Sequence, residues 1–153
     1  MDIKTVGVLG CGLMGSGIAQ VCAASGYKTI VKEVDRAFLD KGLARMRKFL
    51  DDGVAKGKVT ADSRDATLGN LSGTVAFDEM AGCDLVAEAI VENLDAKRSA
   101  YAGLENVVGA HTICLSNTSS LCITELAAST KRPDRFAGLH FFNPVPLMKL
   151  AEV

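Results

Sequence analysis

The sequence predicts a doubly wound α/β fold, in which helices cover both faces of a mostly parallel sheet. Three observations support this prediction. Strand-like and helix-like stretches alternate along the chain, as the crossover connections of a parallel sheet require. A glycine-rich turn joins the first strand-like stretch to the first helix-like stretch, and an acidic residue ends the next strand. The 153 residues, 48% of them hydrophobic, suffice for one domain with a substantial core.

The glycine-rich turn has the G-x-G-x-x-G spacing of a dinucleotide-binding site. In such a turn Gly10 would allow the chain to leave the strand sharply, and Gly12 would leave room for the pyrophosphate. Gly15 would let the helix approach the strand closely. The pyrophosphate would then face free N–H groups at the helix N-terminus, beside Leu13 and Met14. The turn therefore predicts a nucleotide site of the Rossmann type.

The second predicted strand, residues 27–32, ends at Glu33, which lies 23 residues after Gly10. A carboxylate at this position accepts hydrogen bonds from the adenosine ribose and repels a 2′-phosphate. We therefore expect NAD rather than NADP as the cofactor. Asp35 is a competing carboxylate, but it fits better as the N-cap of the following helix.

The other elements follow in order from hydrophobic periodicity and turn residues. The first two strands are expected at 5–10 and 27–32, and the first two helices at 14–24 and 36–54. Residues 57–73 are interpreted as a connector with room for one helical turn. Further strands are expected at 74–77, 85–89, 111–115 and 135–140, helices at 95–104 and 122–128, and a final extended segment at 147–153.

Polar residues follow the predicted strands at the edge where a parallel sheet binds its ligands. Glu92 closes the strand 85–89, and Lys97 lies in the next helix, where a plain surface lysine is an equally good interpretation. Five small polar residues at 116–120, including Asn117 and Ser119, follow another strand. They could simply cap a helix. In the crevice they could instead hold a substrate hydroxyl or the nicotinamide amide.

One histidine has the surroundings of a proton-transferring group. His140 ends a predicted strand, and Glu152 follows twelve residues later, beyond a turn stiffened by two prolines. If the two segments run back past each other, the carboxylate can hold one ring N–H and stabilise the imidazolium. A nicotinamide-dependent alcohol oxidation needs such a base. His111, in contrast, is expected on the surface or in a turn.

Composition and charge exclude several classes of function. The 17 basic and 18 acidic residues nearly cancel, so neither nucleic acid nor an anionic membrane is an expected partner. No apolar run is long enough to cross a bilayer, and the start lacks a signal core, so a cytoplasmic protein is expected. The five cysteines form no metal-ligand pattern and are interpreted as reduced thiols without a metal site. Cys11 alone lies where a helix N-terminus could lower its pKa.

The motifs together resemble one enzyme family. Gly138-Leu139-His140-Phe141-Phe142-Asn143-Pro144, with Ser116–Ser120, Gly10–Gly15 and Ala89–Asn93, is similar to the L-3-hydroxyacyl-CoA dehydrogenase family across essentially the whole chain. The resemblance implies NAD-dependent interconversion of (S)-3-hydroxyacyl-CoA and 3-ketoacyl-CoA, a step of fatty acid β-oxidation or butanoate metabolism. The substrate would then be an acyl-CoA.

The same resemblance implies a role for each candidate residue. His140 would be the general base, Glu152 its orienting partner, and Ser119 the group that holds the substrate oxygen near the nicotinamide. The cofactor crevice would be lined by Glu92 and Lys97, with Glu33 at the adenosine ribose. A weaker candidate, Lys56, would contact the CoA phosphates.

The chain also departs from the family pattern. Family members continue into a helical domain with a catalytic asparagine, much of the acyl-CoA site and the homodimer interface. Residues 1–153 are therefore expected to be the NAD-binding domain of a longer protein, with NAD binding but little turnover. Two alternatives remain open: a non-catalytic NAD-binding or interaction module, and another β-hydroxyacid dehydrogenase with a catalytic lysine.

Overall fold

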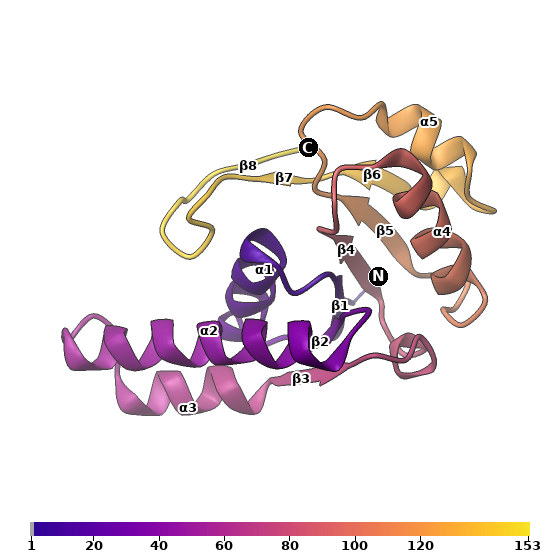
Figure 1. The fold of residues 1–153 in the computed structure, drawn as a ribbon. Coiled ribbons are helices and arrows are strands. Elements are labelled where there is room, and N and C mark those ends of the chain that lie inside the picture. Colours follow the sequence, from indigo (N-terminus) through magenta and orange to yellow (C-terminus); the bar gives the residue numbers. More distant parts are fainter. Residues whose placement is uncertain (1) are drawn as a thin grey trace.

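The computed structural model describes residues 2–153 and contains one parallel sheet of six strands (Figure 1). Its strands are β1 (Thr5–Leu9), β2 (Lys28–Lys32), β3 (Leu71–Thr74), β4 (Leu85–Glu88), β5 (Ile113–Ser116) and β6 (Phe136–Gly138). They lie in the order β3-β2-β1-β4-β5-β6, and every neighbouring pair is parallel. This is the strand order of a dinucleotide-binding Rossmann sheet. The predicted fold class is therefore confirmed.

Helices cover both faces of this sheet. They are α1 (Leu13–Ala24), α2 (Arg36–Ala55), α3 (Ala61–Gly69), α4 (Leu94–Glu105) and α5 (Ile123–Ala128), with 3₁₀ turns η1 (Asp78–Met80) and η2 (Pro133–Arg135). Figure 1 shows α1 and α2 on one side of the sheet, and α4 and α5 on the other. None of the helices within residues 2–153 combines the length and apolar character that a membrane crossing requires.

Two hydrophobic clusters hold the layers together, one on each face of the sheet. Val8 and Val31 pack with Ile18 of α1 and Leu39 of α2 on the first face. The second cluster joins other strand residues to α4 and η1 through Ile30, Val86, Met80, Tyr101 and Leu104. Because the central strands are covered on both faces, they are apolar almost throughout, which is typical of a parallel sheet.

The register brings the ends of the central strands to one common edge. Leu9 lies opposite both Lys32 and Glu88, and Glu88 lies opposite Ser116. The loops that leave these strands therefore meet at the carboxyl edge, where doubly wound sheets bind their ligands.

The prediction of a connector over residues 57–73 is wrong. Most of the segment forms α3 and the edge strand β3. The helix begins because the Thr60 hydroxyl accepts a hydrogen bond from the Ser63 N–H at 3.1 Å. The strand carries a glycine where α2 packs, since a Cβ on Gly73 would lie 3.0 Å from Leu39. This small residue leaves β3 without the apolar pattern that would have predicted it.

The strand expected at 74–77 is also displaced, because only Thr74 belongs to β3. Its hydroxyl accepts the Ala76 N–H at 2.9 Å, which closes a turn and ends the strand. Similarly, the strand expected from residue 111 begins at Ile113. The Thr112 N–H donates to the Gly109 carbonyl, so His111 lies in a turn, as predicted.

The strand expected at 135–140 ends at Gly138, and His140–Phe141 form a separate strand, β7. It pairs antiparallel with β8 (Ala151–Glu152). The segment expected to be extended over 147–153 begins instead in a turn, in which the Leu147 and Met148 N–H groups donate to the Pro144 carbonyl. Strand β6 stops because its partner β5 ends at Ser116, opposite Gly138, and the Phe141 N–H then donates to the Asn117 side chain. Figure 1 shows this β7–β8 hairpin passing over α1.

Candidate active site

A cavity of about 920 Å³ lies along the carboxyl edge of the sheet. Its size is near the upper end of the range for ligand pockets. Nine of the predicted site residues line it: Gly10, Gly12, Leu13, Met14, Glu33, Glu92, Asn117, Ser119 and His140. Four others are not among its lining residues: Gly15, Lys56, Lys97 and Glu152.

The three glycines of the turn have the distinct surroundings that their spacing predicts. Gly10 has a φ of 93°, a conformation that side-chain-bearing residues rarely adopt. A Cβ on Gly15 would lie 2.0 Å from the Gly10 carbonyl oxygen, so the helix packs directly on the strand end. A Cβ on Gly12 would meet no atom within 4 Å and would project into open space at the cavity wall. Gly12 is also the N-cap of α1 and offers no side-chain acceptor to the free N–H groups of that helix.

Glu33 is fixed by the backbone on both sides of its carboxylate. One oxygen accepts the Cys11 N–H and the other accepts the Val34 N–H, each at 2.8 Å. These bonds hold the carboxylate at the mouth of the glycine turn and leave lone pairs on each oxygen for a further donor. The competing carboxylate, Asp35, caps α2 by accepting the Ala37 N–H at 2.7 Å, as predicted.

Cys11 does not have the activated thiol that its position could have provided. Burial, reinforced by the negative charge of Glu33, raises its pKa to about 11, and Arg45 only partly opposes this effect. The thiol is therefore protonated at neutral pH, and Cys11 serves as a small buried side chain.

His140 and Glu152 face each other across the β7–β8 hairpin. They are directly paired in its register, and Nδ1 of His140 lies 3.0 Å from Oε2 of Glu152. The carboxylate therefore fixes the ring so that Nδ1 carries the proton and Nε2 is free to accept one. The hairpin is held over the site because Val145, in its turn, is buried against Gly17 of α1.

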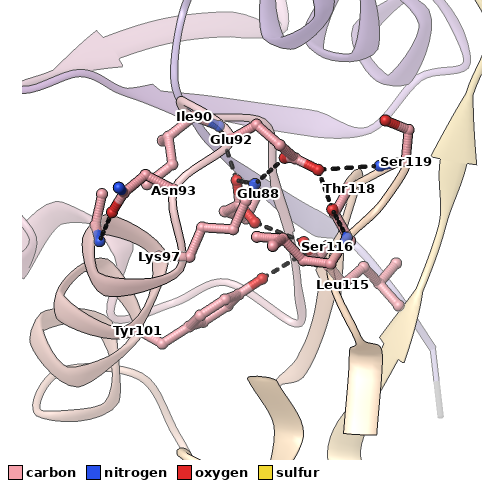
Figure 2. Close-up of polar contacts among 12 residues, drawn as sticks. Glu88, Ile90, Glu92, Asn93, Lys97, Tyr101, Leu115, Ser116, Thr118 and Ser119 are labelled. Atoms are coloured by element: carbon pink, nitrogen blue, oxygen red, sulfur yellow. Dashed lines mark hydrogen bonds and ion pairs between the residues drawn. The ribbon is translucent and has the colours of Figure 1, made fainter. Parts of the chain in front are cut away.

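Glu92 organises the loop after β5. Its Oε1 accepts hydrogen bonds from the Thr118 hydroxyl, the Ser120 hydroxyl and the Ser119 N–H (Figure 2). Burial alone would raise the pKa of Glu92, but these bonds and the nearby charge of Lys97 hold it below its usual value. An ionised Glu92 thus fixes the backbone that presents Ser119 to the cavity.

Lys97 is neither the exposed surface lysine of one interpretation nor a residue that lines the cavity. Its side chain is 1% exposed, and Nζ lies 2.6 Å from Oε1 of Glu88 and 3.2 Å from Oε2 of Glu92. Figure 2 shows it beneath the loop, between these two carboxylates. Its contact with the cavity runs through Glu92.

This network is built on Glu88, which was not among the site residues predicted from the sequence. The Glu88 side chain is fully buried and accepts the Ile90 N–H at 2.8 Å and the Ser116 hydroxyl at 2.6 Å, besides Lys97. Tyr101 closes the network from below, donating its hydroxyl to the Leu115 carbonyl at 3.2 Å. The available signal was an acidic residue inside an apolar strand, which requires a buried partner.

Two lysines lie away from this network, and only the first was predicted as a site residue. Lys56, at the C-terminal end of α2, is exposed and does not line the cavity. Lys32, which was not predicted as a site residue, does line it and is 9% exposed.

Comparison with known proteins gives consistent matches. The family described as "3-hydroxyacyl-CoA dehydrogenase, NAD binding domain" matches residues 5–153. The mitochondrial hydroxyacyl-coenzyme A dehydrogenase of Rattus norvegicus is 48% identical over 99% of this chain and 50% of its own length. A probable 3-hydroxybutyryl-CoA dehydrogenase of Bacillus subtilis is 44% identical over 100% of this chain and 53% of its own.

A solved structure agrees with these sequences. The crystal structure of (S)-3-hydroxybutyryl-CoA dehydrogenase from Ralstonia eutropha superposes with a TM-score of 0.95 at 42% identity, covering 98% of this chain and 53% of that one. The chain therefore spans about half the length of these three relatives, and only 21% of a fatty acid oxidation complex subunit alpha from Idiomarina loihiensis that is 43% identical to it.

Proposed function

Because the chain belongs to the family of NAD-binding domains of 3-hydroxyacyl-CoA dehydrogenases, we propose that it is the cofactor-binding domain of such an enzyme. The complete enzyme would interconvert (S)-3-hydroxyacyl-CoA and 3-ketoacyl-CoA, in fatty acid oxidation or butanoate metabolism. The observation that carries this proposal is the His140–Glu152 pair at 3.0 Å, with His140 on the wall of the cavity.

The residues at the sheet edge fit NAD. Gly12 leaves open space before the uncapped N-terminus of α1, where a pyrophosphate would find free N–H groups and a favourable helix dipole. Leu13 and Met14 would flank it, and Gly10 and Gly15 would maintain the turn. The Glu33 carboxylate would accept hydrogen bonds from the ribose hydroxyls and disfavour a 2′-phosphate. Asn117 and Glu92 would line the nicotinamide end.

Bound NAD would supply the hydride acceptor of the oxidation. The protein would handle the proton: Nε2 of His140 takes it from the substrate hydroxyl, while Glu152 holds the Nδ1–H and stabilises the resulting imidazolium. Ser119 would donate a hydrogen bond to the substrate oxygen, and the Glu92 network would keep its backbone in place. Lys97 acts through Glu92. Lys56 is our weaker candidate for the CoA phosphates, which would have to extend to the far end of α2.

The proposal is tested first by titration of this chain with NADH and NADPH in a calorimeter. We expect NADH to bind more tightly, with little or no reduction of acetoacetyl-CoA by the chain alone. In the complete enzyme, His140→Gln should lower kcat about 10²- to 10⁴-fold and leave NADH affinity unchanged. His111→Gln removes the other histidine, which lies in a turn, and should change neither. Unchanged turnover in His140→Gln would refute the assigned base and favour a lysine-based dehydrogenase, whereas NADH binding without any turnover by the complete wild-type protein would favour a non-catalytic module.

We also propose that the complete protein is a homodimer that acts on an acyl-CoA in the cytoplasm. The dimer interface and much of the acyl-CoA site would then belong to the helical domain of the complete enzyme. Light scattering on the complete protein and fractionation of its cells would test these proposals directly.

A further inference from the structure

Lys32 is a buried cation without a buried anion. It is the last residue of β2, lines the cavity and is 9% exposed. Among residues 2–153, its Nζ has no carboxylate within 4 Å and no hydrogen-bond acceptor; its close partner is the Phe77 ring, 4.1 Å away at the centroid. The other nearly fully buried charged side chains of residues 2–153 each have an ionic partner: Glu88 and Lys97 pair with each other, and Glu105, 4% exposed, pairs with Arg132.

The surroundings of Lys32 make its charge costly. The cavity wall around it is built from apolar side chains, including Leu9, Phe77, Ile90 and Ala100. Burial lowers the pKa of Lys32, and the charge of Glu33 compensates only in part. Every fully shielded side-chain nitrogen within residues 2–153 has a hydrogen-bond partner, so the unpaired Nζ of Lys32 is one that reaches the cavity. Whatever fills this part of the cavity must offer the ammonium an acceptor. A methionine would fill similar space without this requirement, so the lysine points to a ligand that brings an acceptor.

The position of Lys32 selects the part of the ligand that it meets. Neighbouring strand residues project to opposite faces. Glu33 is bonded to the glycine turn through the Cys11 N–H. Lys32 lies two residues after Ile30 and so projects to the same face of the sheet, where Ile30 packs in the cluster that includes α4. Lys32 therefore lies beyond the ribose position and away from the pyrophosphate at α1. This part of the cavity has apolar walls, one aromatic ring and one ammonium, a combination suited to a flat heteroaromatic base.

We propose that Lys32 recognises the adenine of the dinucleotide by donating a hydrogen bond from Nζ to a ring nitrogen. This inference rests on the proposed function, since it takes NAD as the ligand. Phe77 supports the ammonium from one side and leaves N–H donors to point into the cavity. Lys32 is thereby a specificity-determining residue for the base, as Glu33 is for the ribose.

The test compares Lys32→Met with the wild-type chain by calorimetry, using NADH, NADPH and AMP as probes. Methionine keeps an unbranched side chain of similar length and removes the ammonium that lies over the Phe77 ring. Lys28→Met, at the exposed start of the same strand, is the matched control. We expect Lys32→Met to weaken the binding of NADH and of AMP by the same factor, about tenfold to hundredfold. Lys28→Met should bind both as the wild type does, and Lys32→Met should unfold at a temperature no lower than the wild type.

Three results would overturn the inference alone, while NADH binding by the wild type still supports the proposed function. The first is unchanged or tighter binding of NADH and AMP by Lys32→Met. The second is a loss confined to NADPH, which would assign Lys32 to a 2′-phosphate. The third is a clear loss of thermal stability, which would make Lys32 a structural residue. A wild-type chain that binds neither NADH nor AMP would overturn the proposed function and this inference together.

Discussion

Replacing Lys97 by methionine should destabilise the fold far more than replacing the exposed residue beside it. Lys97→Met leaves the fully buried Glu88 carboxylate without its cation. Removing one partner of a buried ion pair costs about 3–5 kcal/mol. Glu88 would keep the Ile90 N–H and the Ser116 hydroxyl as donors, so we expect the lower end of that range. For a chain of this length, about 3 kcal/mol lowers Tm by roughly 6–12 °C.

The assay is urea denaturation followed by circular dichroism. Arg98→Met is the matched control, because Arg98 makes its ion pairs at the surface, with side chains that are 40% and 51% exposed in the Arg98–Glu125 pair. It should cost less than about 1 kcal/mol. The double variant Glu88→Gln/Lys97→Met should recover most of the stability lost in Lys97→Met, since it leaves no buried charge unpaired and keeps an amide oxygen as an acceptor for the Ile90 N–H. If Lys97→Met costs no more than Arg98→Met, Glu88 and Lys97 are not the coupled buried pair described above.

Three further predictions concern the cofactor edge. Gly12→Ala should lower the free energy of unfolding by less than about 1 kcal/mol and yet greatly weaken NADH binding. Gly15→Ala would place a Cβ 2.0 Å from a carbonyl oxygen and should lower the free energy of unfolding, measured by urea denaturation, by about 2–3 kcal/mol. Glu33→Gln should weaken NADH binding about tenfold in calorimetry and reduce the preference for NADH over NADPH. An unchanged preference would contradict the role of Glu33 at the ribose. The pKa of Glu92 is lowered in the folded state, so its contribution is present above the ordinary carboxyl pKa and lost as pH falls through the lowered value. Between neutral and strongly acidic pH, Tm should therefore fall less in Glu92→Gln than in the wild type. An equal fall in Tm would refute the link between Glu92 ionisation and stability.

The parts of the site that depend on local backbone chemistry could be predicted from the sequence. The glycine turn, Glu33 and the Asp35 cap each follow from what a few consecutive residues can do. The His140–Glu152 pairing was also predictable, because a proline-stiffened turn separates the two residues. Strand β3, within the segment 57–73 predicted as a connector, was missed because it carries Gly73 where α2 packs closely. This requirement comes from tertiary packing and leaves no local hydrophobic pattern.

The Glu88–Lys97 network could not be predicted for a related reason. Glu88 and Lys97 lie nine residues apart, but their contact depends on how α4 crosses the end of β4, and Ser116 joins only through the pairing of β4 with β5. A sequence shows that a buried charge needs a partner without showing which one. The interpretation of Lys97 as a surface residue failed because helix periodicity places a side chain on a face and cannot show what covers that face.

The distribution of buried charge argues that this edge is built for ligand binding rather than for stability. Within residues 2–153, the buried charged residues Lys32, Glu88 and Lys97 gather at the carboxyl edge of the sheet, whereas the buried Glu105 side chain pairs with Arg132 at the end of α4. Apolar residues of similar volume are often as stabilising as buried ion pairs, or more so, and the rest of the core is apolar or neutral. The Glu88–Lys97 pair gives rigidity to the loop that carries Ser119, because it fixes Glu92 from beneath. Lys32 has no carboxylate within 4 Å, and its ammonium faces the cavity beside the Phe77 ring, where a ligand can supply an acceptor. The edge therefore combines a polar network that is complete within the protein with a cation that the cofactor completes.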